Sequence, residues 1–533
     1  MKGSTPSPVV DLFAGPGGLG EGLSSFTSHG ERAFRVALSI EMDTFAHQTL
    51  ELRSFFRQFS TTKIPSEYYA FLRGEISRDD LFECRPGQAH AAREEAWKAE
   101  LGKVSPEEVD RRIRRALDGS EDWVLCGGPP CQAYSVVGRS RTGGIRPRDH
   151  RLFLYREYLR ILAVHRPPVF IMENVKGLLS TEVKGNGVFR QMIDDLKSPV
   201  DSSSLTGSVR GSRYHILSLV SPPSAYDLLG FPIFEPRDFI IQCENYGVPQ
   251  RRHRLILLGI REDLIDGPLP LLRPQERAVT AAQVLKGLPR LRSGLSKTQD
   301  GSEEWIVALK KILARGVLGG LAPELKREMS AGLQSIVDGL SVPKAGCGAE
   351  FIPCLVQTGF EPDWYLDRKL DGVCNHAARH HMESDLLRYL YAACFAKLMQ
   401  RSPSLGDFPE ALLPAHRNIS IRGEERYFED RFRVQLAAQP ATTVTSHIAK
   451  DGHYYIHFDP TQCRSLTVRE AARLQTFPDN YLFCGPRTQQ YKQVGNAVPP
   501  LLARRVASVV LQVLKGKTER LASDAIRKEA VPA

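Results

Sequence analysis

The segment Val9-Val10-Asp11-Leu12-Phe13-Ala14-Gly15-Pro16-Gly17-Gly18 decides the fold that we predict for this chain. Its apolar first half is typical of a buried strand, and its glycine-rich second half predicts a turn that opens a helix. A second apolar run, residues 34–40, ends at Glu41, near the ~20-residue spacing at which an acid commonly meets ribose hydroxyls. This order predicts an α/β fold with a nucleotide-type site at the first turn. The glycine spacing differs from the dinucleotide fingerprint, so another adenosine-bearing cofactor stays as open as a nicotinamide one.

The next predicted strand, Trp123–Cys126, leads into Gly127-Gly128-Pro129-Pro130-Cys131-Gln132. Two glycines allow a sharp turn off the strand, and two prolines stiffen the loop and remove two backbone donors. Most single cysteines only fill a core, which is the alternative for Cys131. The proline-rich setting at a strand end instead favours a thiol presented for chemistry.

Charged side chains accompany three further predicted strands. The run 169–172 leads into Glu173, and Gly74-Glu75-Ile76 is expected to mark another strand end. Arg252 and Arg254 precede the run 255–259, and on an extended backbone alternate side chains project to the same side. We therefore expect an acid and two arginines near Cys131.

Basic residues gather in the segment 139–151, which follows Cys131 and contains five arginines and two glycines. Such a segment suits a lid that closes on a polyanion. The whole chain of 533 residues carries a net charge of +10, a weaker indication of the same partner. These features favour a polyanionic partner.

Composition excludes several other classes of protein. No apolar run approaches the ~18 residues of a membrane helix, and the first residues lack the apolar region of a signal peptide, so we expect a soluble protein of the cytoplasm. Ten cysteines occur without a Cys-x-x-Cys pair, which argues against disulfides and zinc ribbons. The Cys and His residues between 347 and 381 fit no common zinc spacing either, so we expect no metal.

The last third of the chain contains two more motifs. Thr467 with Glu470 predicts a capping box that opens the helix 468–475, and capping alone accounts for this Glu. Gly495-Asn496-Ala497-Val498-Pro499-Pro500 precedes an apolar helix at 501–514. There Asn496 either faces a ligand or caps the helix.

Taken in order, these motifs resemble the cytosine-C5 DNA methyltransferases. The resemblance covers residues 8–260 and 441–515 and rests on six blocks, which are Phe13 to Gly18, Pro130-Cys131-Gln132, Glu173-Asn174-Val175, Gln250-x-Arg252-x-Arg254, Arg464 to Pro478 and Gly495 to Pro500. It implies an AdoMet-dependent (S-adenosyl-L-methionine-dependent), Rossmann-like α/β domain with a mostly parallel sheet flanked by helices. Residues 1–260 would form its first part, 261–440 a smaller target-recognition domain, and 441–533 the part that returns to the catalytic domain.

The resemblance also implies roles for individual residues. Cys131 would add to C6 of cytosine, Glu173 would hydrogen-bond N3 and the exocyclic amine, and Arg254, supported by Arg252, would hold O2. The residues implied in AdoMet binding are Phe13, Gly15, Pro16, Gly17, Glu41, Glu75, Pro130, Leu154 and Asn496. At Glu75 the chain departs from the family, which usually has Gly-Asp-Ile in this place.

The expected partner is double-stranded DNA, with the target cytosine flipped out of the helix. We expect a monomer that modifies DNA within a restriction-modification system, with a cognate endonuclease acting separately. One alternative is an RNA (tRNA) cytosine-C5 methyltransferase on the same scaffold. A remote one is a catalytically silent DNA-binding protein, which would tolerate loss of Cys131 or Glu173.

Overall fold

The computed structural model describes residues 5–129, 150–180, 182–183, 186–202, 212–265, 271–414 and 430–529. Pro130, Cys131 and the part of the basic segment up to residue 149 lie outside the described residues, so the predictions made for them stay predictions.

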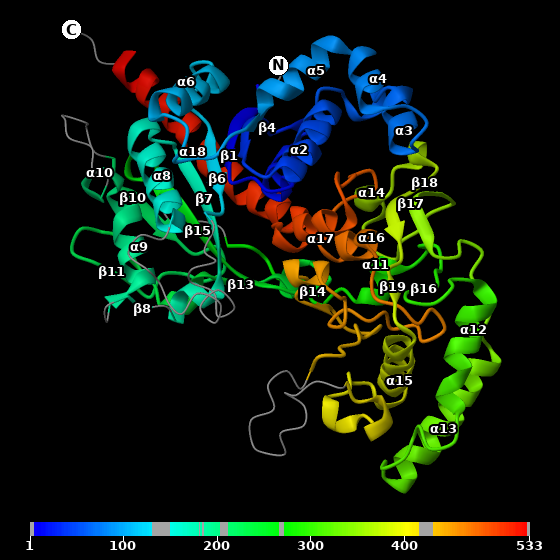
Figure 1. Cartoon of the computed structure of the whole chain (residues 1–533). Coiled ribbons are helices and arrows are strands. Elements are labelled where there is room, and N and C mark those ends of the chain that lie inside the picture. Colours follow the sequence, from blue (N-terminus) through cyan, green and yellow to red (C-terminus); the bar gives the residue numbers. More distant parts are fainter. Residues whose placement is uncertain are drawn as a thin grey trace.

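A mostly parallel sheet of eight strands forms the centre of the larger part of the molecule (Figure 1). Its order is β10-β15-β7-β6-β1-β4-β5, and β13 pairs with β15 off this path. The strands are β1 (Ser7–Leu12), β4 (Phe34–Glu41), β5 (Ala96–Lys98), β6 (Val124–Gly127), β7 (Val169–Val175), β10 (Tyr214–Leu217), β13 (Ile240–Gln242) and β15 (His253–Arg261). The five from β5 to β7 run parallel, whereas β15 is antiparallel to β7. The predicted fold class is confirmed.

Helices cover both faces of this sheet, because its strands are apolar on both sides. Val9 of β1 packs with α1 (Gly18–Ser24) and α18 (Pro500–Glu529) in one core. Its neighbour Val10 faces the opposite core, which contains α6 (Pro106–Leu117), α8 (His150–His165) and α9 (Val188–Lys197). The chain's last described helix therefore completes the layer begun by its first.

Close packing of α1 on α18 explains two glycines of the opening motif. A Cβ on Gly18 would lie 2.1 Å from the carbonyl oxygen of Val498, and one on Gly22 would lie 2.3 Å from that of Pro500. By length and composition the stretch 487–516 could cross a membrane, but 72% of its most apolar window is buried within the protein. It is part of the core formed with the sheet.

The segment between β4 and β6 is mainly helical, as expected, with one correction. Gly74-Glu75-Ile76 is not a strand end but joins α3 (Ser66–Leu72) to α4 (Arg78–Glu83). Gly74 has a φ of +76°, and a capping box between Ser77 and Asp80 starts the next helix. The strand beside β4 is instead the three-residue β5.

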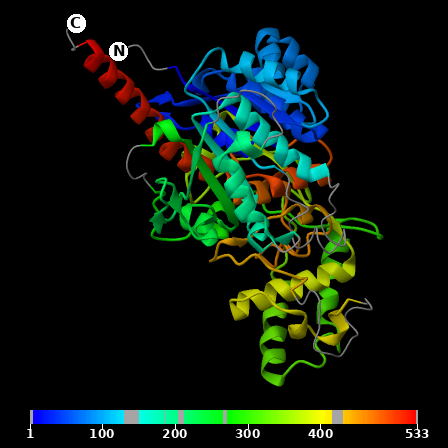
Figure 2. The same ribbon diagram turned by 90° about the vertical axis from the view of Figure 1, so that its left-hand side faces the viewer.

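A second part, residues 271–485, lies beside the sheet, and its helices α12, α13 and α15 form the end that points away from it (Figure 2). These helices, Ser302–Lys310, Pro323–Asp338 and Glu383–Met399, enclose a separate hydrophobic core. Nearer the sheet, β17 (Gly348–Pro353) pairs with β18 (Gly372–Ala377), and β16 (Gly294–Leu295) with β19 (His380–His381). The structure also contains the helices α2 (Thr44–Arg57), α5 (Pro86–Glu95), α10 (Pro199–Ser202), α11 (Ala281–Leu285), α14 (Pro362–Tyr365) and α17 (Arg487–Asn496). Its short paired strands are β2 (Thr27–Ser28), β3 (Glu31–Arg32), β8 (Glu182–Val183), β9 (Asn186–Gly187), β11 (Ala225–Tyr226), β12 (Pro232–Ile233), β14 (Gln250–Arg251) and β20 (Ala441–Thr442).

The short helix α16 (Val468–Leu474) packs on α11 and β18 within the second part and on α17 beyond it, and the capping box predicted for it is confirmed. Arg473 forms an ion pair with Asp479 and donates to the carbonyls of Val284 and Gln357. One core likewise joins α11 to residues between Ala441 and Ala497. Packing is therefore continuous across the expected boundary at residue 440.

Candidate active site

A cavity of about 450 Å³ opens at the carboxyl ends of β1, β4, β6 and β7. Its volume lies within the range of small-molecule sites. The cavity lies at the end of β1, whose neighbours in the sheet are β4 on one side and β6 on the other. The strand order reverses at this point, which is where ligands bind in open α/β sheets. The predicted residues that line the cavity are Phe13, Gly15, Pro16, Glu41, Leu154, Glu173 and Asn496.

The glycine-rich turn forms one wall of this cavity. Phe13, which directly follows β1, has a φ of 55°, a strained value for a residue with a side chain, and lines the cavity. Gly15 has a φ of +57°, and nothing lies within 4 Å of where its Cβ would be. A ligand can therefore approach the backbone at Gly15, as the sequence predicts. Gly17 is placed differently, because its missing Cβ would meet Leu50 and not open space.

Glu41 is tied to this turn by two hydrogen bonds. The backbone N–H of Gly15 donates to one carboxylate oxygen at 2.7 Å, and that of Asp43 donates to the other at 2.8 Å. Burial raises the pKa of the Glu41 carboxyl. The acid at the end of the second strand is thus held at the cavity wall in a fixed position.

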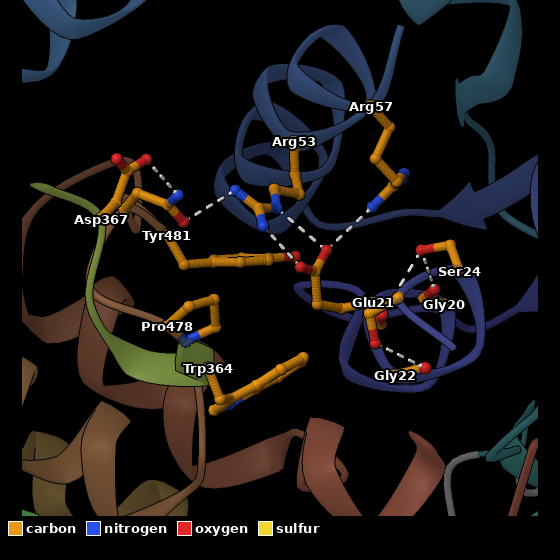
Figure 3. A network of polar contacts seen from close by, with 12 residues as sticks. Gly20, Glu21, Gly22, Ser24, Arg53, Arg57, Trp364, Asp367, Pro478 and Tyr481 are labelled. Carbon is orange, nitrogen blue, oxygen red and sulfur yellow. Dashed lines mark hydrogen bonds and ion pairs between the residues drawn. The ribbon is translucent and has the colours of Figure 1, made fainter. Parts of the chain in front are cut away.

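A buried network of polar contacts holds the turn from behind (Figure 3). Arg53 of α2 donates to Glu21 of α1 at 2.9 Å and to Asn480 at 3.0 Å. Tyr481 donates its hydroxyl to the carbonyl of Pro16. Burial alone would raise the pKa of Glu21, but Arg53 reverses the effect and lowers it. The network fixes both helices and the loop at residues 478–481 around the turn.

Asp11 is an acid at the cavity that sequence reasoning left unassigned. It lines the cavity, and its buried carboxylate lies beside the Cys126 thiol and the backbone N–H of Gly20, but neither of its oxygens forms a hydrogen bond of normal geometry within the described residues. Burial raises its pKa to about 7. A buried polar group without a partner is uncommon, and here it marks a place that a cationic or hydrogen-bonding ligand would complete.

Glu173 and Arg254 meet at the edge between β7 and β15. The Nε of Arg254 lies 2.9 Å from an oxygen of Glu173, and both side chains are largely buried. A Cβ on Gly128 would lie 3.0 Å from the other Glu173 oxygen. The segment that leads toward Cys131 therefore runs directly past this ion pair.

Arg252 has different partners from Arg254. It is buried and donates to the carbonyls of Val444 and Ala497 at 2.8 and 2.9 Å. Burial lowers its pKa to about 9. The N–H of Arg252 bonds the carbonyl of Gln250, so the backbone turns tightly, and the alternation expected for a continuous strand does not hold. Arg252 secures the segment that presents Asn496.

Sequence reasoning missed Glu100, an acid that lines the cavity, whereas the predicted Glu75 lies outside it. The Glu75 carboxylate is exposed and bonds Arg73 at 2.6 Å. Glu100 follows β5, the strand beside β4, and lines the cavity with Ala99 and Leu101. In the sequence, the only local indication of β5 is the apolar pair that begins Ala96-Trp97-Lys98. This pair lies within a stretch that is otherwise predicted to be helical.

Among the residues that the structure describes, no group of three His, Cys, Asp or Glu side chains lies together in a way that could hold a metal ion. The described cavity lining consists of carboxylates, amides, backbone and apolar groups with one lysine.

Comparison with known proteins identifies the family. A family model described as C-5 cytosine-specific DNA methylase matches residues 95–199 and 374–512. The chain is 31% identical over 529 residues to the Type II methyltransferase M.Bpa9945I of Bacillus paralicheniformis, covering 95% of this chain and 99% of that protein. The chain belongs to the C-5 cytosine-specific DNA methylases.

This DNA (cytosine-5-)-methyltransferase is also similar to other proteins. It is 26% identical to the DNA (cytosine-5-)-methyltransferase M.ApeKI of Aeropyrum pernix, covering 78% of this chain and 87% of the relative. A crystal structure of a putative DNA modification methyltransferase from an Escherichia coli prophage matches at 18% identity with a TM-score of 0.49, covering 96% of this chain and 99% of that one. The family is AdoMet-dependent, which implies AdoMet as the methyl donor.

Proposed function

We propose that this methyltransferase transfers a methyl group from AdoMet to C5 of a cytosine flipped out of a specific site in double-stranded DNA. Cys131 would form a covalent bond to C6 during the reaction. One arrangement supports the proposal most. Glu173 belongs to the lining of the cavity, is paired with Arg254, and contacts Gly128, three residues before Cys131 in the sequence.

The residues around the cavity fit AdoMet. Gly15 leaves open space at its backbone, Phe13 offers an aromatic ring, and Glu41 is positioned for ribose hydroxyls. We assign to Glu100 the contact with the adenine ring that the sequence suggests for Glu75. When bound, AdoMet supplies an electrophilic methyl group on a sulfonium. The set proposed to bind it is Phe13, Gly15, Pro16, Glu41, Glu100, Leu154 and Asn496, with Pro130 retained from the sequence.

The chain's own groups would activate the ring. The Cys131 thiolate adds to C6 while Glu173 donates a proton to N3, which makes C5 nucleophilic. C5 would take the methyl group as its bond to the AdoMet sulfur breaks and leaves the electron pair on that sulfur, and the C5 proton would then leave to a base. The bond between C6 and sulfur then breaks, the thiolate is released, and the N3 proton returns to Glu173. Arg254, 2.9 Å from Glu173, is positioned to hold O2 of the same ring.

Stacked cytosine cannot reach such a cavity, so the base must leave the duplex at a cost of a few kcal/mol. We propose that the arginines of residues 139–151 contact phosphates and help to offset this cost. Methylation should therefore weaken steeply as salt is raised. A flat response to salt would reject the phosphate contacts.

Transfer from labelled AdoMet to duplex DNA and to tRNA tests the substrate and the nucleophile. We expect label on cytosine of the DNA, whereas label on tRNA alone would favour the RNA alternative. Cys131→Ser should abolish transfer while AdoMet still binds. Cys84→Ser is the matched control, because Cys84 is an exposed thiol that directly follows α4 and does not line the cavity. Turnover by Cys131→Ser would remove Cys131 from the mechanism.

We further propose that the enzyme acts as a monomer on DNA in the cytoplasm, as the modifying member of a restriction-modification system with a separate cognate endonuclease. The relatives named Type II methyltransferases support this setting. Sequencing of methylated cytosines in cells that express the chain would give one recurring site, and a random distribution would contradict the proposal. Gel filtration tests the monomer.

A further inference from the structure

The charges around the cavity are strongly unequal. Among the described lining residues there is one cationic side chain, that of Lys492 on α17. The acidic ones are Asp11, Glu41, Asp43, Glu100 and Glu173. This inventory suits a ligand that is mainly cationic but carries one anionic group, and the inference rests on the proposed binding of AdoMet in this cavity.

The fold holds Lys492 toward the cavity. Lys492 lies three residues after Gln489 and four before Asn496, so the three share one face of α17, and all of them line the cavity. The opposite face is fastened to the second part of the chain. There Arg487 donates to the carbonyl of Ala378 at 2.9 Å, and Tyr491 donates to that of Leu466 at 2.6 Å. Rotation of the helix is thereby prevented.

Lys492 is available to a ligand, whereas its neighbour on the same face is not. Gln493 accepts a hydrogen bond from Thr49 at 2.7 Å and donates to the carbonyl of Cys484 at 2.8 Å. Within the described residues, the Lys492 ammonium forms no ion pair or hydrogen bond, and its side chain is exposed. Gln493 therefore joins α17 to α2, and Lys492 keeps its donors free.

We propose that Lys492 binds the α-carboxylate of AdoMet. AdoMet has two cationic centres, the sulfonium and the α-ammonium, and one carboxylate. The acidic lining as a whole favours a ligand with these two cationic centres, and the carboxylate of AdoMet needs the single ammonium on α17. A charge-assisted hydrogen bond of this kind strengthens binding by about tenfold to a hundredfold, as is typical of hydrogen bonds to charged groups.

Calorimetry on the full chain with AdoMet and decarboxylated AdoMet tests the assignment. The wild-type protein should bind the decarboxylated compound about tenfold to a hundredfold more weakly. Lys492→Met should weaken binding of AdoMet by a similar factor and leave binding of decarboxylated AdoMet unchanged. Lys492→Arg should recover much of the loss, and Lys344→Met, at an exposed lysine away from the cavity, should change neither constant.

Three outcomes would overturn the inference. Lys492→Met could bind both compounds as the wild type does, or could weaken both equally. It could also leave both constants intact but raise the KM for DNA and flatten its salt dependence, which would assign Lys492 to a DNA phosphate. Equal unfolding temperatures for the variants exclude a folding defect. If the wild-type protein binds no AdoMet, the proposed function fails, which this series separates from failure of the Lys492 contact.

Discussion

Charged side chains are buried in two regions of this methyltransferase, but only in one of them does a charged group lack hydrogen-bond partners. Around α16, Arg473 and Arg464 have their donors satisfied by Asp479, Glu470 and backbone carbonyls. At the cavity, Asp11 forms no hydrogen bond of normal geometry within the described residues. Buried charged groups whose hydrogen bonds are all formed stabilise the fold, and those with unmet hydrogen bonds are candidates for ligand binding. The predictions below separate these two classes by stability and by activity.

The largest effect is expected at Glu173. Glu173→Gln should lower kcat about 10²–10⁴-fold, because the amide cannot donate a proton to N3. The unfolding free energy should fall by only about 1 kcal/mol, since the Gln amide oxygen still accepts a hydrogen bond from Arg254. Initial rates with labelled AdoMet and urea denaturation give the two values. A variant that loses stability but keeps its rate would place Glu173 with the structural groups.

The opposite result is expected at Arg473. Arg473→Met leaves Asp479 buried without its partner and frees the carbonyls of Val284 and Gln357, so it should remove about 3–5 kcal/mol of unfolding free energy. Arg401→Met, which breaks the exposed pair with Asp407, is the control and should change it by less than ~1 kcal/mol. Equal losses in both variants would refute the distinction between the pairs.

Asp11 should make the free protein less stable as pH rises. Its pKa is about 7 in the folded protein and near the ordinary 3.8 when unfolded, so only the unfolded chain loses this proton between these values. The stabilisation present below pH 3.8 is lost as pH rises to 7, by up to ~4 kcal/mol. Asp11→Asn should abolish this part of the pH dependence, measured by urea denaturation at pH 5 and 7.5. Exposed Asp371→Asn should not change the slope, and a slope unchanged by Asp11→Asn would contradict the assignment.

Glu100 and Glu75 offer the smallest contrast. Glu100→Gln should raise the Kd for AdoMet several-fold, because Glu100 lines the cavity, and the net worth of one hydrogen bond is about 1 kcal/mol. Glu75→Gln should leave the Kd unchanged, because that carboxylate faces solvent beside Arg73. Titration calorimetry measures both. The reverse order would restore the role that the sequence suggests for Glu75.

Local patterns predict the parts of the sheet that are made of long apolar runs. β1, β4, β6 and β7 are predictable because each is an apolar run followed by glycine, proline or a charged residue. β5 is not, since three residues inside a helical stretch carry too little pattern, and Glu100 is missed with it. The different partners of Arg252 and Arg254 could not be predicted either, because Arg252 donates to carbonyls about 190 and 245 residues away in the sequence. Contacts of that range leave no periodicity.

The central claim is that Cys131 bonds to cytosine C6 beside the cavity that holds AdoMet. Its most direct test uses duplex DNA in which 5-fluorocytosine replaces cytosine, because fluorine at C5 leaves no proton to be lost and traps the bonded state. After incubation with AdoMet, peptide mapping by mass spectrometry should locate a methylated nucleotide adduct on the peptide that contains Cys131. An adduct on another cysteine, or methyl transfer to cytosine DNA with no adduct on the fluorinated DNA, would contradict the account.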